Sequence, residues 1–510
     1  MRTLLLFWMV ACSAGGATYF VDYESGNNAN AGTTSAAPWK HSPGDDRATA
    51  SAAITLASGD TVTFKGGVNY VMGATNTLQL NSSGVTLLSG HMAGTPWGTD
   101  YAVVDCTLAA PTNAAIDGIW YLAARSNVTV KGFYFTGGTY QDSYSSQLGW
   151  RGGSGTDGYI YVTDCVFSNH VESAIYIVGD FDSGDFSRHF TITNCTFKEI
   201  GTHAIFMRYG LTNVQVLNCS FNRIGTRTNS PGPGGDPIAV FGNDGPSWNA
   251  GLIVRGCNMS DSPIKSHIIL SDQHSGALIE NNYFHGTNGY SGLDLNANGT
   301  NLTIRNNLFD MTVANFYSPI VVDTDQGTGI LLDGLKIYNN TIKAATANIG
   351  LVFLGKGNSG SDQTSKNVDI RNNVFISTTA SRSMIYIETS ATGKPATEMS
   401  TFTCDYNTFQ TNGYATAFHL QSTNYSFSGW KALGYDANSS GGTPNFSSEF
   451  ILDASDTIAL NRGVDLITVA TDRIGTARPQ QIVWDIGAHE LPAPNPARLG
   501  PGKFIGGGRR

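Results

Sequence analysis

Ionisable side chains gather near the middle of the chain, around one short apolar stretch. The segment 261–272, DSPIKSHIILSD, carries Lys265, His267 and Asp272, although only 14% of all residues are charged. Asp236 and Asp294 lie in the segments before and after it. Lys and His can act as general bases, and Asp can act as acid, base or ligand for a hard cation. These residue types would suit acid–base chemistry if the fold brought them together.

A short phrase that recurs from residue 158 onward indicates which elements would position these residues. Its copies read YVTDCVF, TITNCTF, QVLNCSF, IVRGCNM, LIENNYF, TIRNNLF, KIYNNTI, DIRNNVF and TCDYNTF. A second short apolar strand follows each copy and leaves no room for a helix. A repeat of about 20–50 residues is typical of solenoids. Strands at one fixed register predict the stacked coils of an all-β, single-stranded parallel β-helix.

Stacked coils would place like residues in columns, because neighbouring strands lie about 4.8 Å apart. One position of the phrase holds Cys165, Cys195, Cys219, Cys257, Asn282, Asn307, Asn340, Asn373 and Asn407. We expect a buried ladder there, made of free thiols and then of amides. Disulfides are a weaker alternative for an exported protein. Zinc is weaker still, because no paired Cys-x-x-Cys spacing occurs.

The second strands predict which side chains face outward. Their inward column is expected to hold Ile175, Ile205, Ile238, Ile268, Leu293, Ile320, Leu351 and Ile385, so alternate residues face solvent. The polar residues then concentrate between positions 200 and 325, at His203, Arg208, Asp236, Lys265, His267, Asp272, Asp294, Asn296 and Asp323. His267 is expected to project outward, and Tyr290 and Tyr317 stand at strand entrances. Each residue alone fits a turn or surface role, whereas the cluster favours a site.

The two ends of the chain carry signals of their own. Residues 1–17 have Arg2, an apolar run and small residues, which predicts a secretory signal peptide that is too short to span a membrane. The alternative is a lipobox, MVAC, with a lipid-anchored Cys12. The expected product is a secreted, extracellular or periplasmic protein, or else one anchored at the outer membrane surface. The tail 491–510 is expected to be flexible.

Several motifs resemble a known superfamily. YFVDYESGNNANAGTTSAAPWK and SGDTVTFKGGVNY, within residues 18–70, and WDIGAHE at 484–490 resemble the opening and ending of secreted right-handed β-helix proteins of the pectate-lyase-like superfamily. The resemblance implies one right-handed parallel β-helix over 18–490, with an N-terminal cap. Opening coils would span 18–125, regular coils 126–425, and closing coils 426–490. It also implies a polysaccharide lyase or glycoside hydrolase.

β-Elimination on an anionic, uronate-containing polysaccharide is the first functional hypothesis. Lys265 or His267 would remove the proton, and Arg208 would clamp the substrate. Asp236 and Asp294 are further candidate catalytic residues, and Asp236, Asp272 and Asp294 are candidate ligands for Ca²⁺, the one cofactor considered. His203, Tyr290, Asn296, Tyr317 and Asp323 would bind the polysaccharide, with the two tyrosines stacking on sugar rings.

Two alternatives remain. A hydrolase would use paired carboxyl groups, for which Asp294 and Asp323 are about 8 Å apart by strand geometry, a separation that suits inversion. A surface adhesin would bind a polysaccharide without cleaving it. The Lys and Arg pair of the alginate lyase and chondroitinase B family, the polygalacturonase GHG and RIK motifs, and the epimerase DPH motif all have no counterpart here.

Composition narrows the partners. A net charge of −9 argues against nucleic acid, while a local cationic cleft would still admit an anionic polysaccharide. No segment after the signal peptide is apolar enough to span a bilayer. A monomer is expected.

Overall fold

The computed structural model describes residues 15–492, except for 74, 76, 110–117, 123, 139–145, 153–157, 180–187, 227–234, 243–248, 313–316, 324–329, 346–348, 356–363, 380–381, 390–392, 449 and 481–482. The proposed signal peptide up to residue 14, Cys12 of the lipobox, and the tail from residue 493 lie outside that part. The chain divides into two compact units, an N-terminal unit of residues 1–215 and a C-terminal unit of residues 216–510.

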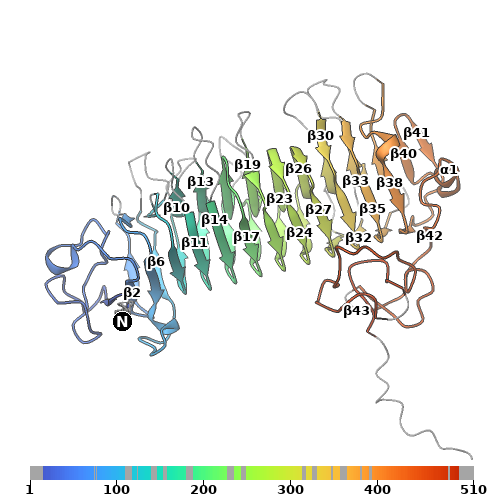
Figure 1. Cartoon of the computed structure of the whole chain (residues 1–510). Coiled ribbons are helices and arrows are strands. Elements are labelled where there is room, and N and C mark those ends of the chain that lie inside the picture. Colours follow the sequence, from blue (N-terminus) through green and yellow to red (C-terminus); the bar gives the residue numbers. More distant parts are fainter. Residues whose placement is uncertain are drawn as a thin grey trace, which may run out of the picture. The chain divides into compact units, whose positions relative to one another are not determined.

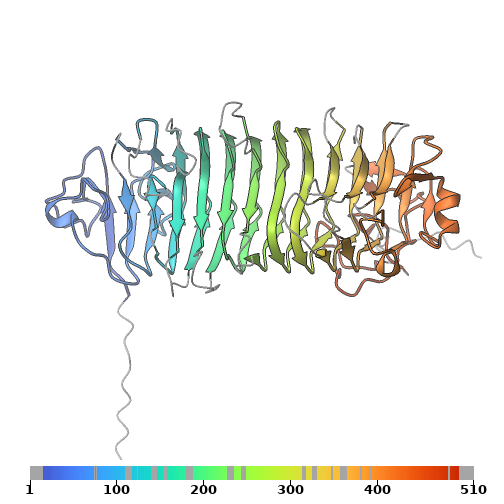
Figure 2. The same ribbon diagram turned by 90° about the horizontal axis from the view of Figure 1, so that it is seen from above.

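Each unit consists of coils that contribute one strand to each of three parallel sheets, and strands of one sheet lie side by side (Figures 1 and 2). In the N-terminal unit the first sheet has the order β1 (Thr18–Val21), β2 (Thr61–Phe64), β5 (Thr86–Ser89), β8 (Val128–Lys131), β11 (Gly158–Thr163) and β14 (Arg188–Thr193). The second has β4 (Leu78–Gln79), β7 (Trp120–Tyr121), β10 (Ser146–Arg151), β13 (Ser173–Val178) and β16 (Ile205–Arg208). The third has β3 (Asn69–Val71), β6 (Ala102–Asp105), β9 (Phe133–Thr136), β12 (Val166–His170) and β15 (Thr196–Ile200). β17 (Val214–Leu217) contains the division between the units.

The C-terminal unit repeats this arrangement. Its first sheet has the order β21 (Ile253–Arg255), β24 (Leu278–Glu280), β27 (Thr303–Arg305), β31 (Lys336–Tyr338), β35 (Asp369–Arg371) and β38 (Thr403–Asp405). The second has β19 (Ile238–Phe241), β23 (Ile268–Ser275), β26 (Ser291–Thr300), β29 (Ser318–Val322), β33 (Gly350–Leu354), β37 (Ser383–Ile387), β40 (Phe418–Leu420) and the antiparallel β41 (Thr423–Tyr425). The third has β18 (Ser220–Ile224), β22 (Asn258–Ser262), β25 (Tyr283–Asn288), β28 (Leu308–Met311), β32 (Thr341–Ala344), β36 (Val374–Ser377), β39 (Thr408–Gln410) and β42 (Ser440–Gly441).

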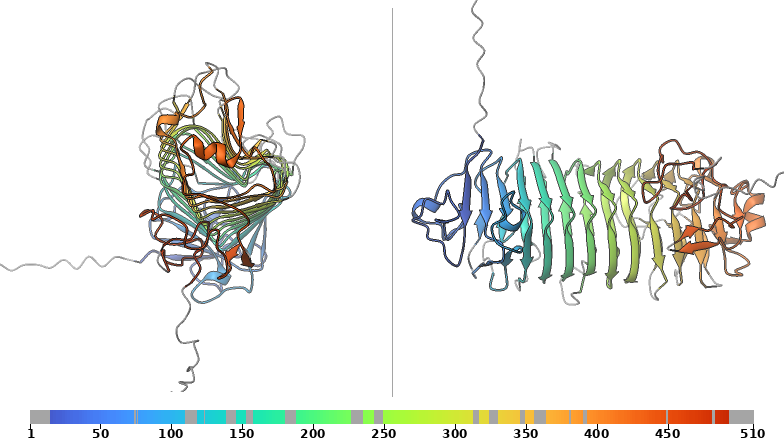
Figure 3. Two further views of the ribbon diagram at one scale, coloured as in Figure 1. Left: turned by 90° about the vertical axis from the view of Figure 1, so that its right-hand side faces the viewer. Right: turned by 90° about the horizontal axis from the view of Figure 1, so that it is seen from below.

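A few short elements complete the units. β20 (Asn249–Ala250), β30 (Ile330–Asp333) and β34 (Thr364–Lys366) pair at the border of the second sheet, and β43 (Phe446–Ser448) pairs with β44 (Ile451–Leu452). The helices are α1 (Phe427–Ala432) and the 3-10 turns Ala50–Ala52, Gly90–Met92 and Met399–Thr401. Parallel strands that advance coil by coil define the expected right-handed parallel β-helix, whose three sheets enclose one interior within each unit (Figure 3).

The core of each unit is a set of stacked inward side chains. The aromatic residue that ends the recurring phrase stacks on its equivalent in the next coil, with ring centroids 5.1 Å apart for Phe167 and Phe197 in the N-terminal unit. Phe284 and Phe309 of the C-terminal unit are 4.6 Å apart. All four rings are fully buried. The alternation seen in the sequence is therefore the alternation between core and surface.

The Asn-Asn doublets of the C-terminal unit have a simple explanation. The first Asn of each pair, such as Asn306 or Asn339, has a positive φ of 53° or 52°, a turn conformation that Asn tolerates better than most residues. The second Asn points inward and is buried. We call the inner set the amide column, which comprises Asn282, Asn307, Asn340 and Asn373 of the doublets and Asn407, which follows Tyr406.

The amide column forms the ladder expected from the sequence. Each side-chain amide donates to the side-chain oxygen of the next Asn, at 3.0, 3.0, 3.0 and 3.1 Å in turn. Each oxygen also accepts the preceding backbone N–H, as Asn340 does from Asn307 at 2.9 Å. The column ends on the buried Asp436, whose Oδ1 accepts from Asn407 at 3.0 Å. The cysteines at the equivalent earlier positions are free and buried, as expected.

The closing residues 464–490 pack against the turns that carry Asn306, Asn339 and Asn372, the first Asn of three doublets. Asn306 donates to the carbonyl of Thr471 at 2.7 Å, and Asn372 donates to that of Val464 at 2.7 Å. The WDIGAHE motif ends in Glu490, which forms a fully buried 2.8 Å ion pair with Arg478. The motif thus fastens the end of the chain to coils of the same unit.

Candidate active site

The outer face of the second sheet in the C-terminal unit presents two columns of alternating side chains. Its inward column pairs Ile268 with Leu293, Leu293 with Ile320, Ile320 with Val352, and Val352 with Ile385. Strand alternation then turns the next residues outward. They are Asp294, Val321, Phe353 and Tyr386 in one column, and Asn296, Asp323, Gly355 and Glu388 in the other. Val321, Phe353 and Gly355 are nevertheless buried, so the half-buried members of the two columns are Asp294, Tyr386, Asn296, Asp323 and Glu388.

A continuous set of rings follows this face. We call it the aromatic row: Tyr290, Tyr317, Phe353, Tyr386 and His419. Tyr290 and Tyr317 are stacked 5.0 Å apart at 7°, and Tyr386 and His419 are stacked 3.9 Å apart at 10°. Phe353 joins the two pairs, with centroid distances of 5.6 Å to Tyr317 and 5.7 Å to Tyr386.

The stacking limits what the two predicted tyrosines can do. One face of Tyr290 and one face of Tyr317 are covered by each other, and the Phe353 ring stands at 89° to Tyr317 on the following coil. A sugar cannot lie flat between these rings. Tyr317 therefore offers an edge and a hydroxyl group to a ligand, and the expected stacking of a sugar on both tyrosines does not fit the geometry.

Three carboxylates border the aromatic row. Asp294, Asp323 and Glu388 are half-buried, and each raises the pKa of Tyr317. Burial has the largest effect, followed by Asp323, and the pKa of Tyr317 reaches about 12. Asp294 and Asp323 are one coil and two residues apart, which corresponds to about 8 Å between their Cα atoms. The structure thus brings together Tyr290, Tyr317, Asp294, Asn296 and Asp323 of the predicted set.

Lys265 lies in the segment that leads into β23. It precedes Ile268 by three residues, as Tyr290 precedes Leu293, so the two occupy neighbouring positions in one column. Arg382 holds the equivalent position three residues before Ile385. Lys265 and Arg382 are half-buried. Cationic side chains therefore stand in the same column as the first two rings of the aromatic row.

Asp236 sits deeper, at the corner before β19. Its side chain is 3% exposed and accepts the backbone N–H of Ser266 at 2.9 Å. Burial, reinforced by Asp294, raises the pKa of Asp236 to about 8, although Lys265 opposes the shift. Asp236 is therefore largely protonated at neutral pH.

The three carboxylates considered for Ca²⁺ are not brought together. Asp236 precedes Ile238 by two residues, and Asp272 follows Ile268, its partner in the next strand, by four. That offset is roughly 20 Å along the strands, so one ion cannot bind both. The Asp272 side chain lies outside the described part, and no group of three or more His, Cys, Asp or Glu side chains suited to a metal occurs among the residues that are described.

His267 does not project outward, as its position in the alternation predicted. Its side chain is 0% exposed, and its ring lies 5.8 Å from the core residue Phe284. It precedes β23, at the corner between two sheets, where strand alternation no longer decides which way a side chain points. Burial, with a smaller effect from His285, lowers the pKa of His267 to about 3. The imidazole is therefore neutral at physiological pH, within the core.

His203 and Arg208 belong to the N-terminal unit. His203 is 8% exposed and packs against Phe206 with centroids 4.7 Å apart. Arg208 ends β16, and its guanidinium lies over the rings of Phe206 and Tyr209, at 5.8 and 4.5 Å. These contacts are sufficient to explain both side chains as packing partners of local aromatic rings.

Four residues on this face were absent from the predicted set: Phe353, Tyr386, Glu388 and His419. Phe353 was missed because the inward column was expected to contain Leu351, whereas Val352 occupies it. A slip of one residue reverses the faces of a strand. The run GLVFL is uniformly apolar and gives no alternation from which to detect the slip. Tyr386 and Glu388 were recognisable as outward residues, but the carboxylate–aromatic pattern that unites them requires the three-dimensional register.

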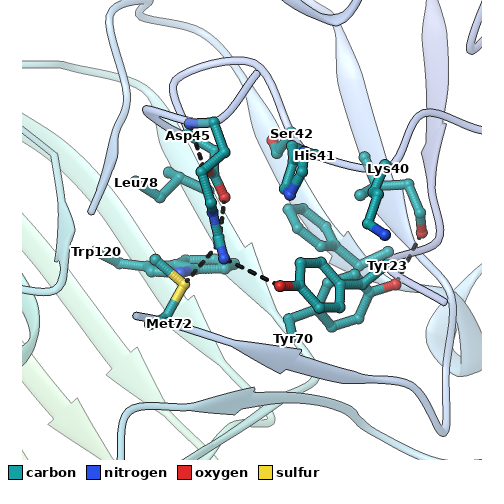
Figure 4. Close-up of a pocket in the computed structure, with 12 residues that line it drawn as sticks. Tyr23, Lys40, His41, Ser42, Asp45, Tyr70, Met72, Leu78 and Trp120 are labelled. Carbon is teal, nitrogen blue, oxygen red and sulfur yellow. Dashed lines mark hydrogen bonds and ion pairs between the residues drawn. The ribbon is translucent and has the colours of Figure 1, made fainter. Parts of the chain in front are cut away.

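A small pocket in the N-terminal unit is a less suitable site (Figure 4). Arg47 crosses it, donating to both carboxylate oxygens of Asp45 at 2.8 and 2.9 Å and to the Tyr23 hydroxyl at 3.2 Å. The space that remains is about 10 Å³, enough for about one water molecule. The pocket is therefore an internally bonded part of the cap.

Fold and face together define a right-handed parallel β-helix protein with a carboxylate-and-aromatic surface on one sheet. No family model matches the chain, and no curated protein matches its sequence. No helix among the described residues is long and apolar enough to cross a membrane.

Solved structures of the same architecture resemble it. The pectate lyase Pel9A has 18% identity and a TM-score of 0.46, over 93% of this chain and 96% of that one. A rhamnogalacturonan lyase has 17% identity and a TM-score of 0.47, over 72% and 84%. XylC, solved in complex with xylose, has 11% identity and a TM-score of 0.49, over 93% and 98%. A likeness of this degree does not assign a reaction, and the strand order of the chain itself confirms the expected fold.

Proposed function

We propose that the protein is a carbohydrate-active enzyme that binds a polysaccharide along the outer face of β26, β29, β33 and β37 and hydrolyses it. The observation that carries this proposal is the alignment of the aromatic row with Asp294, Asp323 and Glu388. The rings form a stiff border, and the carboxylates accept hydrogen bonds from sugar hydroxyls. Successive coils about 4.8 Å apart would meet successive sugar units of an extended chain.

Asp294 and Asp323 are the proposed reacting pair. Their Cα atoms lie about 8 Å apart by strand geometry. That spacing is compatible with the wider carboxyl separation of inverting glycosidases, in which one carboxylic acid protonates the leaving oxygen and the other carboxylate activates a water molecule. The bond between the anomeric carbon and the bridging oxygen breaks as the water oxygen attacks from the opposite side. Hydrolysis with inversion at the anomeric centre is the expected result.

β-Elimination on a uronate polymer is the second candidate. Lys265 and Arg382 favour it, because they bring cationic groups to the strand-entrance column of the same face. Arg382 would neutralise the uronate carboxylate, and Lys265 would remove the adjacent proton. Ca²⁺ is not required by this arrangement. Secretion, which such a substrate would require, remains a prediction from residues 1–17.

A panel of neutral, N-acetylated and uronate-containing polysaccharides separates these reactions. New reducing ends without ultraviolet absorbance indicate hydrolysis, whereas an absorbing unsaturated product indicates elimination. Asp294→Asn and Asp323→Asn should each lower the hydrolytic rate by roughly 10²–10⁴-fold. Asp310→Asn, on the outer face of the third sheet, is the matched control and should retain the rate. Binding without cleavage of any polysaccharide would instead identify an adhesin.

A further inference from the structure

The Tyr317 ring is held in place by contacts with two neighbouring rings and by a backbone hydrogen bond. Tyr290 covers one face of its ring, and Phe353 from the following coil meets it at 89°. Its backbone N–H also donates to the carbonyl of Tyr290 at 2.5 Å. These contacts fix the direction of the phenol group, and they leave no ring face on which a sugar could stack.

The hydroxyl group of this fixed ring is available to a ligand. No hydrogen-bond partner for the Tyr317 hydroxyl occurs within the described part of the chain, and the side chain is only half-buried. The ring lies 5.6 Å from that of Phe353, which occupies the same outward column as Asp294, and burial, together with the charges of Asp323, Glu388 and Asp294, raises the pKa of Tyr317. The group therefore stays protonated at any pH at which a carbohydrate enzyme works, and it can donate a hydrogen bond throughout that range.

A donor at this position supplies what the neighbouring residues lack. Carboxylates, when ionised, only accept hydrogen bonds, whereas a sugar also presents ring and bridging oxygens that need donors. A preorganised donor costs no reorganisation when charge develops on an oxygen in the transition state. The Tyr317 hydroxyl would add a donor to a face whose ionised groups, Asp294, Asp323 and Glu388, act electrostatically on it.

We propose that Tyr317 acts through its hydroxyl, as a fixed hydrogen-bond donor to the glycan beside Asp294 and Asp323, and not as a sugar-stacking ring. This inference rests on the proposed function for its setting, because it assumes that the glycan occupies the same face. It differs from the role that the sequence suggested, which was stacking. The hydroxyl, rather than the ring, then determines how well the glycan is held for reaction.

Replacement of the hydroxyl alone tests the proposal. Tyr317→Phe keeps the ring in the aromatic row, and kcat/KM on the cleaved polysaccharide should fall about 10²- to 10³-fold, mainly in kcat, as for the loss of one preorganised donor. Thermal unfolding of this variant should match the wild type. Tyr161→Phe, an exposed tyrosine of the N-terminal unit, is the control and should keep its activity.

Tyr317→Leu separates the ring from the hydroxyl. If Tyr317→Phe is as active as the wild type while Tyr317→Leu is impaired, the ring acts alone and the proposal is overturned. If the wild type binds a polysaccharide without cleaving it, the proposed hydrolysis fails. The role of Tyr317 is then judged by calorimetry, where Tyr317→Phe should weaken binding of that polysaccharide about tenfold. Unchanged binding would overturn it.

Discussion

The amide column and the aromatic row both run along successive coils of the C-terminal unit, but the spacing of the amides is regular and that of the rings is not. Inside, four successive amide–amide hydrogen bonds differ by only 0.1 Å. Outside, successive rings are 5.0, 5.6, 5.7 and 3.9 Å apart, at angles from 7° to 89°. A buried amide must satisfy its neighbours, so one residue type repeats. An outer side chain meets no such demand, and its identity can change from coil to coil.

The strongest way to break this contrast is to interrupt the amide column. Asn340→Leu removes the acceptor of two Asn307 N–H groups and a donor to the carbonyl of Ile304. Each orphaned buried group costs about 1–3 kcal/mol, so a loss of about 4 kcal/mol in the free energy of unfolding is expected. Urea unfolding followed by circular dichroism measures it.

Lys336→Leu provides the matched control for that substitution. It makes a polar-to-leucine change on the outer side of β31, where the Lys336 side chain is half-buried. Its effect should stay within about 0.5 kcal/mol. Equal losses in the free energy of unfolding for the two variants would mean that the amide column contributes no more to stability than an outer polar residue. The contrast between inner and outer positions would then be wrong.

Sequence reasoning captured the inner region far better than the outer one. The amide column was predictable residue by residue, because burial forces Asn to recur at a fixed point of the phrase. The outer face was predictable only where alternation is visible, as at Asp294, Asn296 and Asp323. The predicted direction of the His267 side chain was wrong because His267 precedes a strand at a corner. The predicted direction of Phe353 was wrong because the run GLVFL shows no alternation of polar and apolar residues.

Buried ionisable groups make the stability of the folded chain depend on pH. Asp236 has a pKa of about 8, raised from 3.8, so between these values the folded protein holds a proton that the unfolded chain has lost. Stability due to Asp236 therefore falls as pH rises, by about 1.4 kcal/mol per unit. His267 and His274 act oppositely: their pKa values drop from 6.5 to about 3 and about 4, so their contribution is lost as pH falls below 6.5.

Maximum stability is therefore expected near pH 6.5, with a decline of up to about 2 kcal/mol by pH 8. Asp236→Asn should abolish that decline, whereas Asp310→Asn on the outer face of the third sheet should preserve it. Unfolding free energies at pH 6.5, 7.2 and 8.0 measure the slope. The same alkaline slope in Asp236→Asn would show that Asp236 titrates normally.

The smallest effect on stability is expected from the aromatic row. Phe353→Leu removes the ring between Tyr317 and Tyr386 but leaves an apolar side chain, so the free energy of unfolding should fall by only about 1 kcal/mol. The Michaelis constant for the polysaccharide should rise several-fold, because Tyr317 loses the ring that holds it. Stability and steady-state kinetics on the same preparation check both. If Phe353→Leu lowered the free energy of unfolding as much as Asn340→Leu, the aromatic row would contribute to stability as the amide column does.

The amide column has a direction, since every side-chain amide donates toward the following coil and the last one, Asn407, donates to Asp436. Asp436 is the terminal acceptor of this series of hydrogen bonds. Whole coils that begin and end at an Asn can be added or removed without leaving a buried amide group unpaired, as long as Asp436 is retained as the terminal acceptor. The length of the outer face, and with it the proposed polysaccharide-binding surface, can thus change in steps of one coil, while the interior bonding stays the same.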